Sequence, residues 1–84
     1  MDTSSMKSTA IAGYIVRSSE RPTHILCEDC DFYPESLVGV GQRAAKVYKT
    51  ERNALRAGNR PVTAHPVNSY GIEISWLREK GWAA

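Results

Sequence analysis

The chain has 84 residues, a formal net charge of +2, 42% hydrophobic residues and 24% charged residues. This composition is that of an ordinary globular protein and excludes wholesale disorder. A domain of this length buries only about 60–65% of the surface of its unfolded chain, so its core must be thin. The net charge is too small to identify a partner, and the distribution of charge along the chain is more informative.

Two absences narrow the class of protein further. No apolar run approaches ~18 residues, so no transmembrane helix is expected. The N-terminal segment MDTSSMKST lacks the apolar stretch of a signal peptide, and we therefore expect a cytoplasmic protein without membrane attachment. Residues 1–8 are polar and serine-rich, which predicts a flexible tail before a single domain at residues 9–84.

The first half of this domain predicts an antiparallel hairpin. Residues 9–17 (TAIAGYIVR) and 23–27 (THILC) are rich in β-branched side chains and are separated by a turn cluster. Gly13, inside the first strand, predicts a bulge or the close approach of another backbone. Residues 28–41 contain proline and glycine, and they predict a loop with one helical turn near Pro34–Leu37.

The central stretch, residues 44–60 (AAKVYKTERNALRAGNR), predicts a short strand that runs directly into a short helix. Thr50 has the side-chain oxygen that a helix N-cap requires, and Glu51 places a negative charge where the helix dipole favours it. Gly58 predicts the C-terminal end of the helix. A helix this short is not stable alone, so we expect Leu55, together with Ala54 or Ala57, to pack against a sheet.

The last part of the chain predicts an edge strand and one segment with two interpretations. Residues 62–67 (VTAHPV) suit an extended strand, but Pro66 restricts that strand to the edge of a sheet. Apolar and polar residues alternate over residues 72–76, which is typical of a half-buried strand. A helix across residues 76–80 that ends at Gly81 is the competing interpretation, and the sequence leaves both open.

Together these elements predict an α+β fold, a mainly antiparallel sheet of roughly three to five strands with one short helix packed on one face. A thin core and an unpaired strand edge are compatible with a monomer or with a homodimer formed by edge pairing. The predicted core residues are Ile11, Ile15, Ile25, Val47, Leu55, Ile72, Ile74 and Trp76.

One short motif predicts a candidate zinc site. His24, Cys27 and Cys30 follow the spacing H-x-x-C-x-x-C, and a Cys-x-x-Cys turn supplies two of the about four ligands that zinc requires. His65 is the candidate for the fourth. Against this, the motif lacks the glycine or proline that usually closes such a turn, and a strand at residues 23–27 directs His24 and Cys27 to opposite faces. The alternative is no metal or other cofactor, with Cys27 in the core and the others at the surface.

A second pattern concentrates positive charge in the central stretch. Residues 43–60 contain six Lys and Arg residues and a single acidic residue, Glu51. Arg52, Arg56 and Arg60 recur every four residues, which forms one stripe along the helix and just past its end. Such a stripe binds a phosphate backbone by releasing counterions, or it is the solvated outer face of a packed helix. The predicted partner-binding residues are Tyr48, Lys49, Arg52, Arg56 and Arg60.

The acidic residues at 28–35 are segregated from this basic stretch, which favours electrostatically steered docking on a larger partner. The sequence contains no nucleophile elbow, glycine-rich phosphate loop or zinc-protease motif, so we expect no catalytic residues and no enzyme. The two thiols are not predicted to be redox-active, because the acidic residues around them raise thiol pKa values.

The junction V-Y-K-T-E-R-x-A-L-x-A at residues 47–57, together with the size and layout of the chain, resembles small accessory proteins of phages and mobile elements, including anti-CRISPR proteins. This resemblance implies stoichiometric binding to a host protein or nucleoprotein complex without catalysis. The leading hypothesis is therefore a small non-enzymatic binding protein, such as an inhibitor. The alternative is a nucleic-acid-binding protein that uses the basic stripe, with zinc as a structural element.

Overall fold

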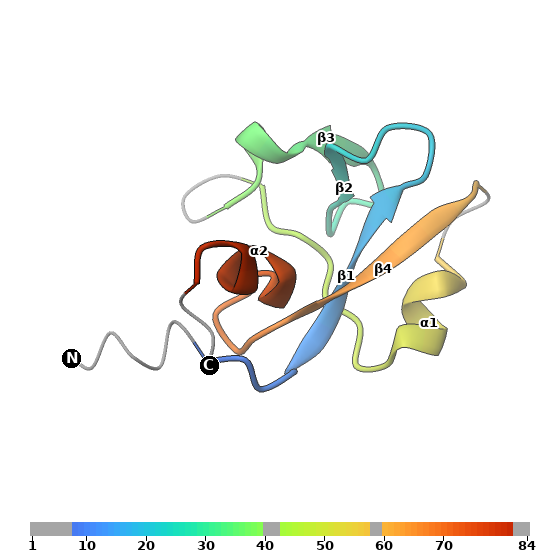
Figure 1. Cartoon of the computed structure of the whole chain (residues 1–84). Helices are drawn as coiled ribbons and strands as arrows, with labels where there is room; N and C mark the ends of the chain where they lie inside the picture. The colour runs from blue at the N-terminus through green and yellow to red at the C-terminus, as the bar shows by residue number, and fades with distance from the viewer. Residues whose placement is uncertain (1–7, 40–42, 58–59, 82–84) are drawn as a thin grey trace.

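The computed structural model describes residues 8–39, 43–57 and 60–81 of the chain. These residues form an α+β domain built on a four-stranded antiparallel sheet (Figure 1). The strands are β1 (Gly13–Ser18), β2 (His24–Leu26), β3 (Phe32–Pro34) and β4 (Val62–Val67), in the spatial order β3-β2-β1-β4. The helices are α1 (Glu51–Leu55), α2 (Ile74–Glu79) and the 3-10 turn η2 (Glu35–Leu37). The predicted α+β class is confirmed, with one α-helix more than the sequence indicated.

The sheet carries one α-helix on each face. Successive residues of β1 point to opposite faces. Val16 packs with Leu26, with Ala54 of α1 and with Ala57 just after the helix, and we call this side the α1 face. Ile15 points to the other side, the α2 face. The core cluster of the α2 face consists of Ile15, Ile25 and Val67. Figure 1 shows α1 and α2 on opposite sides of the β1–β4 pair.

The predicted hairpin and edge strand are confirmed. β1 and β2 are antiparallel with Arg17 opposite Ile25, and β4 pairs antiparallel with the whole of β1 at the edge of the sheet. Pro66 lies opposite Tyr14, whose N–H and C=O are bonded to Tyr48 and not to β4. The proline therefore stands at a position of the ladder that requires no N–H donor, and β4 tolerates it without losing a bond to β1.

The segment before α1 does not form the predicted strand. Residues 43–48 instead make isolated bridges, in which Ala45 pairs with Cys27 and Tyr48 pairs with Tyr14. Tyr14 and Tyr48 exchange two backbone hydrogen bonds of 2.8 Å, so the segment is bonded to both β1 and the end of β2. Residues 43–48 thus occupy the space between these strands where they diverge.

Gly13 permits this insertion. A Cβ atom at Gly13 would lie 2.4 Å from Val47 Cγ1 and 2.9 Å from the carbonyl oxygen of Tyr48. The close backbone approach predicted for this glycine is therefore confirmed, and residues 43–48 contact β1 here because no side chain intervenes.

The region before this segment is more regular than predicted. β3 pairs antiparallel with β2 in the register His24–Pro34, Ile25–Tyr33 and Leu26–Phe32. The helical turn expected near Pro34–Leu37 is confirmed as η2, with Pro34 at its N-cap. Strand β3 was not predicted, because three residues that end in proline are too short to show a periodic pattern.

Helix α1 begins as predicted and packs through only part of the predicted apolar face. The backbone N–H of Asn53 donates to Thr50 Oγ1 at 3.2 Å, which confirms the N-cap. The expected packing of Leu55 is wrong, because that side chain is 49% exposed. The buried residues are Ala54 within the helix and Ala57 just beyond its C-cap, and both belong to the core cluster of the α1 face. Their small side chains let α1 approach the sheet closely.

The α1 helix is also shorter than expected. It ends at Leu55 with Arg56 as its C-cap. The predicted C-terminal glycine, Gly58, lies outside the described residues.

Of the two interpretations of residues 72–80, the strand is wrong and the helix is correct. Ile74 and Leu77 of α2 are buried, a spacing of three that places both on one side of a helix. Trp76 lies between them and is 41% exposed. Lys80 is the C-cap, and Gly81 follows with φ of 71°, the conformation expected after a helix.

The predicted core is partly correct. Ile15, Ile25 and Ile74 are buried, and Ile72 is half-buried. The prediction of burial is wrong for four residues, whose exposed fractions lie between 41% and 56%: Ile11, Val47, Leu55 and Trp76. The apolar character of a side chain does not determine which side of its element meets the sheet.

The α1 packing predicts that two adjacent substitutions lower the free energy of unfolding by different amounts. Ala54→Asp places a carboxylate against the sheet without a partner, so we expect the free energy of unfolding to fall by about 3 kcal/mol or more. Leu55→Asp is the matched control and should cost about 1 kcal/mol or less, since its side chain reaches water. Urea denaturation followed by circular dichroism measures both, and equal losses would contradict this packing.

Candidate functional site

The predicted partner-binding residues lie on the α1 face but fall into two groups. Lys49, Arg52 and Arg56 are exposed on and beside α1. Tyr48 and Arg60 line a cavity of about 800 Å³. Because α1 ends at Leu55, only Arg52 lies within the helix, whereas Arg56 is its C-cap and Arg60 follows beyond its end, where the sequence placed it.

The cavity opens beside α1 on the same face of the sheet. Leu26, Phe32 and Tyr48 line it and also belong to, or pack against, the core cluster that holds α1. Lys46 adds a cation to its lining, and the Nζ atom of Lys46 lies 5.5 Å from the centre of the Tyr48 ring. We call Lys46, Tyr48, Lys49, Arg52, Arg56 and Arg60 the basic surface.

The cations of the basic surface are not neutralised within the described part of the chain. Over residues 8–39, 43–57 and 60–81, the ion pairs are Arg17 with Glu35, Arg17 with Glu73 and Arg43 with Asp29. None of these pairs involves a lysine or arginine of the basic surface. The positive charge of the basic surface is therefore directed to solvent or to a partner.

The four metal-ligand candidates are not gathered at one place. His24 and Cys30 line the cavity on the α1 face. Cys27 is buried, with its Sγ atom 3.7 Å from the carbonyl oxygen of Ile25. His65 lies opposite Ile15 and therefore on the α2 face. Among the residues that the structure describes, no three His, Cys, Asp or Glu side chains form a group that could hold a metal ion.

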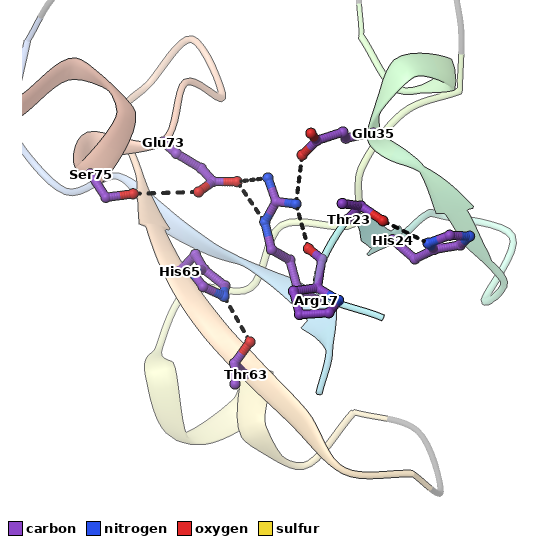
Figure 2. A network of polar contacts seen from close by, with 9 residues as sticks. Arg17, Thr23, His24, Glu35, Thr63, His65, Glu73 and Ser75 are labelled. Atoms are coloured by element: carbon purple, nitrogen blue, oxygen red, sulfur yellow. Dashed lines mark hydrogen bonds and ion pairs between the residues drawn. The ribbon is translucent and has the colours of Figure 1, made fainter. Parts of the chain in front are cut away.

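Both histidines make local contacts with threonines instead (Figure 2). Thr23 Oγ1 lies 3.2 Å from His24 Nδ1, and Thr63 Oγ1 lies 2.7 Å from His65 Nε2. β1 separates the two strands that carry these histidines. Burial raises the pKa of Cys27, and the charge of Asp29 adds to the shift, so this thiol is a weak nucleophile at neutral pH.

An ion cluster on the α2 face was not predicted. Arg17 Nε donates to Glu73 Oε1 at 2.9 Å, and Arg17 Nη2 contacts the same oxygen. Arg17 Nη1 donates to Glu35 Oε2 at 2.8 Å and to the carbonyl oxygen of Pro22 at 2.7 Å. Figure 2 shows the guanidinium group between the two carboxylates. We call Arg17, Pro22, Glu35 and Glu73 the Arg17 cluster.

Within the Arg17 cluster, the pair of Arg17 and Glu73 is largely shielded from water, whereas the side chain of Glu35 is 54% exposed. The side chains of Arg17 and Glu73 are each 15% exposed. Burial alone would lower the pKa of Arg17, but the hydrogen bonds and charges of Glu73 and Glu35 outweigh burial and raise it. One sequence signal was available, because Arg17 is two residues after Ile15 in a strand and so shares its buried face.

A second, exposed cluster neutralises part of the acidic region. Tyr33 Oη donates to Asp29 Oδ2 at 2.7 Å, and Arg43 Nη1 lies 3.3 Å from the same oxygen. The Arg43 guanidinium carbon is 3.9 Å from the centre of the Tyr33 ring. The Tyr33 hydrogen bond is the main cause that lowers the pKa of Asp29. The predicted segregation of charge is thus reduced, since Arg43 of the basic stretch pairs with the acidic loop.

The α2 face carries a concavity of different character. It has a volume of about 600 Å³ and is lined mainly by apolar groups. Val47, Tyr70 and Trp76 border it and are 52%, 49% and 41% exposed. This groove explains why two predicted core residues, Val47 and Trp76, contact both the protein and solvent.

Comparison with known protein families, with curated proteins and with solved structures found no match for this chain. In the described ranges, neither helix has the length and apolar composition needed to cross a membrane.

The Arg17 cluster predicts a large loss of stability when its cation is removed. Arg17→Met leaves the carboxylate of Glu73 shielded and unpaired, so we expect a loss of about 3–5 kcal/mol in the free energy of unfolding. The double variant Arg17→Met/Glu73→Met should recover part of that loss. Arg43→Met, which breaks an exposed ion pair, is the control and should cost at most about 1 kcal/mol. Denaturant unfolding of the four proteins measures this, and equal effects of Arg17→Met and Arg43→Met would refute it.

His65 predicts a pH dependence of stability. Burial lowers the pKa of His65 below its ordinary value of 6.5; the charge of Glu73 opposes this shift and that of Arg17 adds to it. As the pH falls through 6.5, the unfolded chain takes up a proton before the folded chain does, so the free energy of unfolding decreases. His65→Gln should flatten this decrease between about pH 7.5 and 5.5, a window above most carboxylate pKa values.

Urea denaturation at both pH values measures the slope of the free energy of unfolding against pH. His24→Gln leaves His65 in place and is the matched control, which should keep the wild-type decrease. An unchanged slope in His65→Gln would show that other groups cause it.

Proposed function

We propose that this chain is a small non-enzymatic binding protein that docks on a host protein or nucleoprotein complex through its basic surface. The single observation that carries this proposal is the set of exposed lysine and arginine side chains without an ion pair in the described chain. By contrast, Arg17 and Arg43 are matched by carboxylates of the same chain. Cations left unmatched on one face attract an acidic or phosphate-rich surface.

The shape of the domain supports a docking role. Lys49, Arg52 and Arg56 are exposed on and beside α1, which packs on the sheet, and Lys46 and Arg60 line the cavity on the same face. Such preorganisation reduces the entropy lost on binding. A stoichiometric inhibitor of a host complex, as the resemblance to anti-CRISPR proteins implies, is the specific form of the proposal.

Direct contact with nucleic acid is the second candidate function. It is favoured because aromatic and cationic side chains line the same cavity, including Phe32, Tyr48, Lys46 and Arg60. Proteins that bind nucleic acid without reading a duplex combine these two kinds of side chain.

The proposal predicts that charge reversal on α1 weakens binding without unfolding the domain. Arg52→Glu/Arg56→Glu changes two exposed side chains, so circular dichroism should remain that of wild type. We expect the association rate with the partner to fall about tenfold or more at low salt, and the difference to shrink as salt screens the charges. Surface plasmon resonance at two salt concentrations, with a partner identified by affinity purification from the native host, measures the rate.

The matched control is Arg78→Glu/Lys80→Glu, which makes the same change in charge on exposed residues of α2 and its C-cap. This variant should bind nearly as fast as wild type. If the association rate falls equally in both double variants, net charge alone governs association and the basic surface is not the docking site.

A further inference from the structure

The cavity on the α1 face collects cations from three distant parts of the chain. Arg21 belongs to the turn after β1, Lys46 to the segment that bonds to β2, and Arg60 to the approach to β4. None of the three forms an ion pair with another described residue. The fold therefore gathers three unmatched positive charges around one concavity.

Two aromatic side chains line the same cavity. Phe32 and Tyr48 are half-buried, and both pack against the core cluster of the α1 face while their remaining surface borders the cavity. The Nζ atom of Lys46 lies 5.5 Å from the centre of the Tyr48 ring. A cation is thus held next to an aromatic ring that the core keeps in place. This pairing suits a ligand that has a flat ring and a negative charge close together.

We propose that the cavity binds a segment of single-stranded nucleic acid. An unstacked base lies against Tyr48 or Phe32, and the adjoining phosphates contact Lys46, Arg21 and Arg60. The inference rests on the proposed docking role of the basic surface, and it identifies the partner component as a nucleic acid strand.

A single strand fits the cavity better than a duplex does. The aromatic surfaces lie inside a concavity of about 800 Å³, within the usual range of about 300–1,000 Å³ for ligand sites. Paired and stacked bases do not expose their rings to such a site, whereas an unpaired base enters it. A duplex would contact only the cations at the surface.

Two carboxylates limit the electrostatic part of this binding. Glu20 and Asp31 also line the cavity and are exposed. They oppose a phosphate, so stacking must supply much of the affinity. With at most three phosphates contacted, the slope of log affinity against log salt should be no steeper than about −2, from roughly −0.7 per phosphate of a single strand.

Fluorescence anisotropy of the full chain with labelled oligothymidylate, and with a duplex of the same length, tests the inference. We expect the single strand to bind more tightly than the duplex at low salt. Tyr48→Leu keeps an apolar side chain for the core and removes the stacking surface, so affinity should fall about tenfold. Lys46→Gln should weaken binding and make the salt slope shallower by about 0.7.

Glu20→Gln is the opposite test, because removing a carboxylate from the cavity should tighten binding of the single strand. Arg78→Gln, on the exposed surface of α2, is the matched control for Lys46→Gln and should leave the affinity unchanged. Circular dichroism of every variant checks the fold. Equal binding of duplex and single strand, equal effects of Lys46→Gln and Arg78→Gln, or no binding of oligothymidylate at low salt would each overturn the inference.

The outcome is separable from that of the docking proposal. If the inference alone is wrong, Arg52→Glu/Arg56→Glu still weakens binding of the host partner while oligothymidylate does not bind to the chain. If the docking proposal alone is wrong, oligothymidylate binds in the cavity and the double reversal on α1 changes no partner association.

Discussion

The guanidinium group of Arg17 links β1 to three other parts of the chain. From β1 it bonds to the turn at Pro22, to η2 through Glu35 and to the N-cap of α2 through Glu73. Shielding charges from water costs several kcal/mol per ion, and the cost is offset only when the pairing is complete. This pairing adds to the other contacts that hold α2 against the sheet, which are the burial of Ile74 and Leu77 and the bridge between Glu73 and Val67.

The two faces of the sheet differ in how their charged side chains are paired. On the α2 face the charges of Arg17 and Glu73 neutralise each other in an ion pair, and an apolar groove lies beside them. On the α1 face, small alanines hold the helix and the cations remain unmatched in the described chain. Arg78 and Lys80, on α2 and at its C-cap, are also exposed and without an ion pair in the described chain, so the α1 face differs in the number of its unmatched cations.

The insertion of residues 43–48 between β1 and β2 links the fold to the candidate site. A regular strand was expected there, but the segment bonds to both strands through isolated bridges. Because Gly13 lets this backbone approach β1, Tyr48 and Lys46 come to line the cavity with Arg60. The sequence did not predict this irregular segment, and the segment brings the cationic and aromatic side chains together at the cavity.

The sequence by itself determined the features that depend on neighbouring residues. The N-cap at Thr50, the edge strand with Pro66, the turn at η2 and the close approach at Gly13 follow from backbone preferences within a few positions. Only the tertiary structure decided that Ala54 and not Leu55 meets the sheet, that residues 74–79 are helical, and that Arg17 pairs with Glu73 across 56 positions. These outcomes depend on which surface is available to be buried, and a one-dimensional pattern does not contain that surface.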